Sequence, residues 1–205
     1  FDLAYENYFK AGGMASVGVF YRRVDDMMRN RTTLRSVGWA QVQRWVSMPE
    51  NISRATTAGL EFEFKGRGHE LLPFLLSAST PLTLNASISI YRSRGDAVQG
   101  PNNRLDGQQP WSATIGADYR LVGLTEKPIT LGGSVAYAPQ YSLQQTSEQG
   151  LEFGRYRSID VFAMLPLSQT VSMRLLGQNL WPMPASKSTH GMRKEASNRE
   201  AEQWQ

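Results

Sequence analysis

Few residues of this chain are placed to carry out catalysis or to bind a metal. Its two histidines, His69 and His190, lie far apart in polar stretches, and neither has a carboxylate at a metal-ligand spacing such as H-E-x-x-H. Serine and threonine hydroxyls are plentiful, yet no G-x-S-x-G motif and no nearby histidine would activate one. Cysteine is absent, which excludes a thiolate nucleophile and a disulfide framework. The sequence therefore predicts no catalytic residue, no metal site and no enzymatic activity.

Arginine and aromatic residues suggest a different chemistry, which is ligand recognition. A guanidinium binds anionic groups through paired hydrogen bonds, and aromatic faces attract cations and other rings. The two types together suit an anionic, partly aromatic ligand such as an iron chelate. The candidates lie in or beside two stretches predicted to be long connections, 95–110 and 142–157: Arg104, Trp111, Tyr141, Arg155, Tyr156 and Arg157.

Composition and charge exclude several classes of protein. The 205 residues are 40% hydrophobic with a mean hydropathy of -0.41, and no run approaches the roughly 20 apolar residues of a membrane-spanning helix. The net charge is +4, but lysine and arginine are scattered rather than gathered in one basic stripe, so nucleic-acid binding is not expected. No signal peptide is visible at Phe1 and residues 200–205 are polar. We expect the chain to begin and end inside a longer protein.

The strongest pattern is the alternation of apolar and polar residues with a period of two. In residues 82–90, LTLNASISI, the apolar and polar side chains alternate without exception. Residues 113–120 and 129–137 follow the same rule. Such alternation predicts strands with one apolar and one polar face. Weaker copies of the pattern, which bring the total to about eight strands, lie at 3–9, 14–28, 58–65, 159–165 and 171–181.

Strand length and connection length both favour a membrane barrel over a soluble sandwich. Most of the predicted strands approach the roughly 9 to 11 residues that a tilted strand needs to cross hydrocarbon. Outer-membrane barrels alternate short periplasmic turns with longer external loops. One connection, 66–81, falls on the side of the barrel where short turns are expected, yet it is long. We expect a short helix there. The short connections are 10–13, 122–128 and 166–170, and the long ones are 31–54, 95–110, 142–154 and the stretch after 181.

The faces of the predicted strands assign lipid and lumen. Charged side chains on the polar faces, such as Glu61 and Asp118, must meet water, because a cation at the bilayer midplane costs about 2 to 4 kcal/mol and an acid somewhat less. Tyrosine, tryptophan and phenylalanine gather near the strand ends, as an interfacial girdle requires. The residues expected to face lipid include Leu60, Leu84, Ile88, Leu131 and Val135.

Several segments, in order, resemble the β-barrel of TonB-dependent receptors. They are FDLAYENYF at 1–9, ASVGVFYRRVDDMM at 15–28, ATTAGLEFEFKG at 55–66, LTLNASISIYRSR followed by PNNRLDGQQPWSATIGADYRL at 82–121, and RLLGQNLW at 174–181. The resemblance covers nearly all of residues 1–181. It implies an all-β, antiparallel, up-and-down transmembrane barrel, of which this chain supplies about eight of about 22 strands. Residues 1–205 would form the C-terminal segment of that barrel, with 181–205 an external loop leading to a final strand that the chain lacks.

The same resemblance implies a function and a set of partners. The protein would lie in the outer membrane of a Gram-negative bacterium and import a scarce nutrient, with a ferric siderophore as the expected ligand and no cofactor. Energy would come from the TonB complex of the inner membrane through a plug domain that is absent from this chain. The arginines of the outer rim have an alternative role, which is to contact anionic lipopolysaccharide. Two other functions stay open, a passive porin-like barrel and a soluble β-rich binding module.

Overall fold

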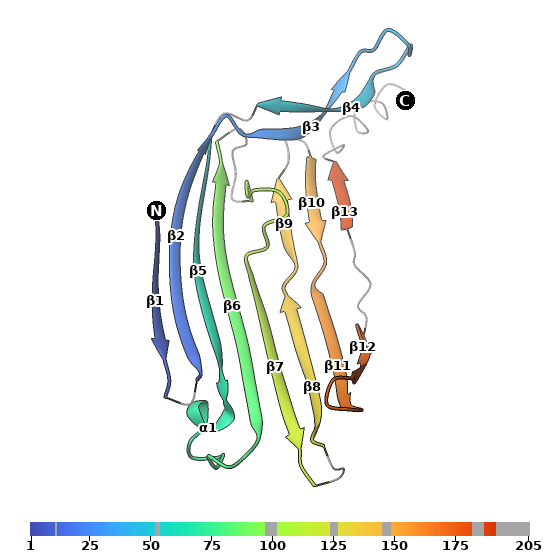
Figure 1. Cartoon of the computed structure of the whole chain (residues 1–205). Coiled ribbons are helices and arrows are strands. Elements are labelled where there is room, and N and C mark those ends of the chain that lie inside the picture. The colour runs from blue at the N-terminus through green and yellow to red at the C-terminus, as the bar shows by residue number, and fades with distance from the viewer. Residues whose placement is uncertain are drawn as a thin grey trace, which may run out of the picture.

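The computed structural model describes residues 1–10, 12–51, 54–96, 102–123, 127–144, 149–181 and 187–191. Its main body is a tall, curved sheet of eight antiparallel strands (Figure 1). Each strand pairs with the next one of the sheet along the chain, so the order is up and down throughout. The strands are β1 (Asp2–Tyr8), β2 (Met14–Asp25), β5 (Arg54–Arg67), β6 (Leu82–Gly95), β7 (Trp111–Leu121), β8 (Ile129–Ala138), β11 (Tyr156–Pro166) and β12 (Ser172–Gly177). The predicted all-β, up-and-down architecture is confirmed.

Register places most of the apolar side chains of the eight strands on one face. Leu60 of β5 lies opposite Ile90 of β6, and Ile115 of β7 lies opposite Val135 of β8. Because side chains alternate along a strand, every second residue from these positions shares that face. Leu84, Ile88 and Leu131 belong to the same set. The sheet therefore has one continuous apolar face, as the alternation predicted.

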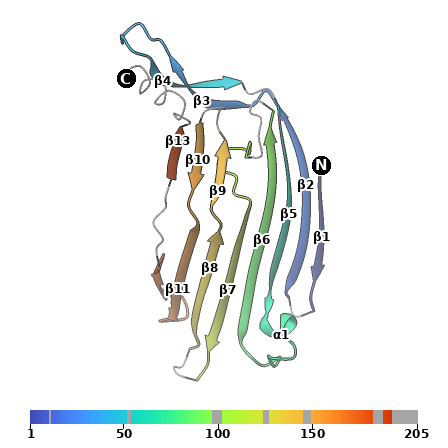
Figure 2. The ribbon, with the colours of Figure 1, turned by 180° about the vertical axis from the view of Figure 1, so that it is seen from behind.

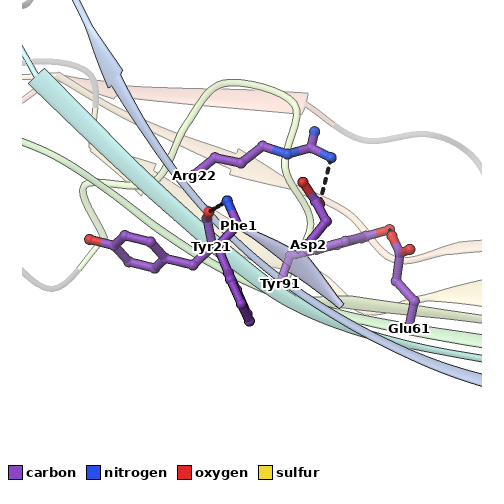
Figure 3. A network of polar contacts seen from close by, with 6 residues as sticks. All are labelled: Phe1, Asp2, Tyr21, Arg22, Glu61 and Tyr91. Carbon is purple, nitrogen blue, oxygen red and sulfur yellow. Dashed lines mark hydrogen bonds and ion pairs between the residues drawn. The ribbon is translucent and has the colours of Figure 1, made fainter. Parts of the chain in front are cut away.

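The opposite face is polar and its groups contact one another. In Figure 3 the hydroxyl of Tyr91 donates a 3.0 Å hydrogen bond to Glu61, and Arg22 of β2 pairs with Asp2 of β1 at 3.0 Å. At the other side of the sheet, Asp160 of β11 accepts a hydrogen bond from the Ser158 hydroxyl at 3.0 Å. The charged residues predicted to avoid lipid thus form a polar wall.

Glycines on this polar wall give large side chains room to lie flat. A Cβ at Gly59 would overlap the ring of Phe20 and lie 2.8 Å from Cδ1 of Tyr91. The rings of Phe20 and Tyr91, whose centroids are 6.0 Å apart, flank Gly59 in the register of β2, β5 and β6. At Gly132 of β8, a Cβ would overlap both Asp118 and Phe162. The wall is therefore packed tightly across its strands.

At one end of the sheet the connections carry extra strands, which corrects the expectation of long loops. Residues 31–54 were predicted to be a loop, but β3 (Met28–Arg35) and β4 (Arg44–Asn51) form a hairpin there. Residues 142–154 likewise contain β9 (Tyr141–Gln144) and β10 (Gln149–Phe153), and β10 also pairs with β13 (Lys187–Gly191). β13 lies inside 181–205, which was predicted to be an external loop, while 182–186 and 192–205 fall outside the described residues. The alternation in these stretches is short or weak, and the pairing between the strands establishes them.

The opposite end of the sheet has shorter connections, which Figure 2 shows at the bottom from behind. The chain turns from β1 into β2 at 9–13, from β7 into β8 at 122–128 and from β11 into β12 at 167–171. The connection from β5 to β6 begins with a single helical turn, α1 (Gly68–Leu71). This turn confirms the short helix expected in 66–81. Among the described residues, no helix has the length and apolar character to cross a membrane.

Substituting Gly59 by alanine should destabilise the sheet, because the added methyl group overlaps the Phe20 ring. Overpacking of this kind costs about 1 to 3 kcal/mol. The matched control is Gly18→Ala on β2, where the nearest atom to an added Cβ is the Leu3 carbonyl oxygen at 3.9 Å. Urea unfolding of the two variants of the full-length protein, folded in lipid vesicles, measures the difference. Equal midpoints would mean that Gly59 is not held between the two rings.

Candidate functional site

The apolar face ends in aromatic residues, as a membrane interface requires. Trp111 of β7 and Tyr137 of β8 lie with their ring centroids 5.3 Å apart. Arg157 pairs with Tyr137 in the register of β8 and β11, and its guanidinium lies 4.6 Å from the centroid of Trp181. Tryptophan, tyrosine and arginine are the side chains that hold a protein at the level of lipid head groups. This cluster marks the upper edge of the apolar face.

The height of the apolar face approaches the apolar band of about 25 Å that surrounds an outer-membrane barrel. Trp111 and Tyr119 both lie on this face of β7 and are eight residues apart. Eight residues span about 27 Å along a strand, and a strand tilt near 40° would reduce this to about 21 Å of membrane depth. Between them Ile115 is 62% exposed, although it sits in the middle of a strand. A strand face that is both apolar and exposed is typical of a surface that contacts lipid.

The connection from β6 to β7 folds over the polar wall. The backbone N–H of Leu105 donates to the hydroxyl of Ser93 at 2.9 Å, and the amide of Gln108 donates to the hydroxyl of Thr57 at 2.9 Å. Ser93 and Thr57 lie opposite each other on β6 and β5, on the polar side of the sheet. Residues 102–110 therefore cover the upper part of that wall instead of extending away from it (Figure 1).

An ion pair that is buried on its arginine side holds this connection to the β3–β4 hairpin. The guanidinium of Arg29 binds the carboxylate of Asp106 through two hydrogen bonds, Nε to Oδ2 at 3.0 Å and Nη2 to Oδ1 at 2.6 Å. The Arg29 side chain is only 5% exposed, whereas the Asp106 side chain is 44% exposed. A buried charge needs such a partner, because losing it leaves the other group desolvated and uncompensated. The pair thus fixes two external segments against each other.

Beside this connection lies a cavity of about 450 Å³. The rings of Tyr141 in β9 and Phe153 in β10 are stacked at one side of it, 4.6 Å apart and nearly parallel. Arg104 contributes a cation and Glu152 an anion to the lining. The backbone N–H of Gln144 donates to the carbonyl of Asn102 at 2.8 Å, which ties β9 to the folded connection. The remaining lining residues are Asn102, Pro110, Gln140, Ser142 and Gly154.

The surroundings of Tyr141 favour the protonated form of its hydroxyl. Burial raises the pKa of Tyr141 above its ordinary value, and the nearby carboxylate of Asp106 raises it further, whereas Arg104 acts in the opposite direction. A phenol whose pKa is raised stays neutral throughout the physiological pH range. Tyr141 can therefore donate a hydrogen bond to an anionic group, with the positive charge of Arg104 close by.

The structure separates the six predicted ligand-binding residues into groups. Arg104 and Tyr141 both line the cavity, and Arg155 and Tyr156 follow its lining residue Gly154 along the chain. Trp111 and Arg157 lie instead on the apolar face. Their position was readable from the sequence, because Trp111 is in phase with Ile115 and Arg157 is in phase with Ile159.

Two cavity residues, Glu152 and Phe153, were not singled out from the sequence. The alternation of Leu151, Glu152 and Phe153 could have indicated a strand there. Within the described residues there is no group of three or more histidine, cysteine or acidic side chains that could hold a metal ion.

Comparison with known proteins gives one match. A family model described as TonB dependent receptor-like, beta-barrel matches residues 1–180, which is most of the chain. Neither a curated protein nor a solved structure matches the chain.

Replacing Ile88 by arginine should hinder folding into a membrane far more than replacing its neighbour Ser87. Ile88 lies on the apolar face of β6 opposite Phe62, whereas Ser87 lies on the polar wall opposite Glu63. An arginine facing lipid near the midplane costs about 2 to 4 kcal/mol. Folding of the full-length protein into lipid vesicles, followed by its heat-modifiable mobility in gels, compares the variants. If both cost the same, the assignment of the two faces is wrong.

Replacing Asp106 by asparagine should loosen the connection at residues 102–110, because it leaves the buried Arg29 guanidinium without its counter-charge. We expect faster proteolytic cleavage within this connection while the barrel stays folded. The control is Asp2→Asn, which removes an ion pair whose two side chains are each 61% exposed. Exposed pairs contribute about 0 to 1 kcal/mol, so this control should behave like the wild type. Unchanged cleavage in the Asp106 variant would contradict the structural role of the pair.

Proposed function

We propose that this chain, which belongs to the family of TonB-dependent receptor β-barrels, serves a receptor that imports a ferric siderophore or a similarly scarce anionic nutrient. The match over residues 1–180 carries the proposal, and the cavity at the external end supports the choice of ligand. The ligand would bind at the external connections and then pass along the polar wall.

Family membership by itself establishes the setting. The barrel lies in the Gram-negative outer membrane, and the family consists of transporters energised through TonB rather than of enzymes. The sequence-based predictions of location, of transport and of the absence of enzymatic activity are confirmed at this level. Because the family consists of energised transporters, it also excludes the two alternatives that the sequence left open, a passive porin-like barrel and a soluble β-rich binding module. We further propose that the TonB complex acts on this barrel through a plug domain.

The chemistry of the cavity supports an anionic ligand with planar, unsaturated groups. The stacked rings of Tyr141 and Phe153 would present an aromatic surface to a planar chelating group. Arg104 would balance negative charge on a metal chelate, and the neutral hydroxyl of Tyr141 would donate a hydrogen bond to it. Glu152 would disfavour a uniformly anionic ligand and so contribute selectivity.

The inward fold of residues 102–110 supports a role for this connection in ligand access. It covers the polar wall through Ser93 and Thr57, and it contributes Asn102, Arg104 and Pro110 to the cavity. A ligand that enters the lumen along this wall would pass the connection. The pair of Arg29 and Asp106 would then set how firmly the cavity is held in shape.

Substituting Arg104 by glutamine should weaken binding of a ferric siderophore by about 10- to 100-fold, because a hydrogen bond to a charged group contributes about 1.5 to 3 kcal/mol. The measurement is quenching of intrinsic fluorescence by a panel of catecholate and hydroxamate iron chelates added to the full-length receptor. The matched control is Arg94→Gln, because the neighbouring Ser93 faces the polar wall and Arg94 therefore faces away from it. Equal affinities for the two variants would remove Arg104 from the proposed site.

A further inference from the structure

The connection from β5 to β6 is unusual for its end of the barrel. It runs from 68 to 81, whereas the neighbouring connections at the same end are 9–13, 122–128 and 167–171. Short connections mark the periplasmic side of an outer-membrane barrel. The transport function assigned above gives no role to this longer segment (Figure 1).

The backbone of this connection satisfies many of its own hydrogen bonds. The N–H of Leu72 donates to the carbonyl of Gly68 at 2.9 Å, and the N–H groups of Leu75 and Leu76 donate to the carbonyl of Leu72 at 3.1 and 2.9 Å. At the start of α1, the Glu70 carboxylate accepts a hydrogen bond from the backbone of Arg67 at 2.9 Å. A segment that bonds internally in this way can enter the edge of a bilayer at little cost.

The connection folds onto the apolar face, not over the lumen. Gly66 and Phe64 of β5 lie opposite Leu84 and Ala86 of β6, so all four belong to the apolar face. The Glu70 carboxylate lies directly over Gly66, since a Cβ there would be 2.7 Å from Glu70 Oε2.

Apolar packing then joins the connection to the wall. A Cβ at Gly68 would lie 2.7 Å from Cδ1 of Leu76 and 3.0 Å from Cδ2 of Leu82, and Leu82 lies opposite Tyr119 on the apolar face. Phe64, which contacts Phe9 at a ring separation of 5.9 Å, is only 3% exposed. The lower edge of the lipid-facing wall therefore continues into the connection without a break.

The outermost side chains of the connection are large, apolar and uncovered. Phe74 is 78% exposed, Leu75 is 69% exposed and Leu71 is 46% exposed. Two polar residues of the same segment are turned to each other, since the hydroxyls of Ser77 and Ser79 lie 2.9 Å apart. Apolar side chains crowded at the tip of a turn need an apolar surrounding.

We propose that the β5–β6 connection is an interfacial anchor, which inserts Leu71, Phe74 and Leu75 into the phospholipid leaflet at the periplasmic end of the barrel. Continuity with the lipid-facing wall at Phe64 and Leu82 selects lipid as the occupant of this surface. The anchor would fix the depth of β5 and β6 in the membrane.

A fluorophore at position 75 tests this proposal. Leu75→Cys is introduced into the full-length receptor in a background without other cysteines, labelled with a nitrobenzoxadiazole probe, and reconstituted into vesicles of phosphatidylethanolamine and phosphatidylglycerol. We expect blue-shifted emission, strong quenching by brominated acyl chains and protection from aqueous iodide. The matched control is Ser79→Cys, an exposed position in the same connection, which should show the opposite pattern.

Three results would overturn the anchor. They are equal iodide quenching at positions 75 and 79, no quenching by brominated lipid at 75, and protection of 75 that appears only after a periplasmic extract is added. The last result would mean that a protein covers the surface. Heat-modifiable mobility confirms that each labelled receptor is folded, and Leu71→Cys repeats the measurement should the label at 75 prevent folding.

Discussion

The structure depends on one constraint, which is that every backbone N–H and C=O within hydrocarbon needs a hydrogen-bonding partner. The six inner strands of the sheet meet this by pairing on both sides, as from Met14 opposite Lys65 to Asp25 opposite Arg54, whereas within the described residues β1 and β12 pair on one side only. Pairing fixes register, and register fixes the faces. A slip of one residue in β5 would turn Glu61 and Glu63 into lipid. This register therefore fixes the positions of the polar wall, of the aromatic cluster at the upper edge of the apolar face, and of the cavity.

Glycines on the polar wall allow large aromatic side chains to lie flat against the sheet, so that these side chains do not fill the lumen. Phe20 and Tyr91 lie against Gly59, and Phe162 lies against Gly132, so these rings rest on the wall rather than projecting from it. The guanidinium of Arg174 in turn lies 4.4 Å from the centroid of Phe162. Such contacts brace neighbouring strands from the lumenal side. They leave the hydroxyls and carboxylates of the wall available to water and to passing solutes.

Composition decides over which face each long connection folds. Residues 102–110 are polar and find Ser93, Thr57 and Arg29 as partners, so they cover the lumenal side. The β5–β6 connection is apolar, and its Leu76 packs beside Leu82 on the lipid side. Both connections join two neighbouring strands of the same sheet. The side chains of each connection decide whether it covers the polar face or the apolar face. The connections at the two ends of the barrel therefore cover different faces of the sheet, the polar face at the external end and the apolar face at the periplasmic end.

The sequence by itself determined the eight strands and their faces, because a period of two is local and each strand carries it independently. It also indicated that Trp111 and Arg157 lie on the apolar face, since each is separated by an even number of positions from an apolar residue of its own strand. Only the tertiary structure decided which candidates form a site. Arg104 and Tyr141 meet at one cavity because β9 and the β6–β7 connection are hydrogen-bonded, and Arg29 reaches Asp106 across 77 positions. Such contacts depend on long-range pairing and on how each connection folds over the sheet, which no local pattern encodes.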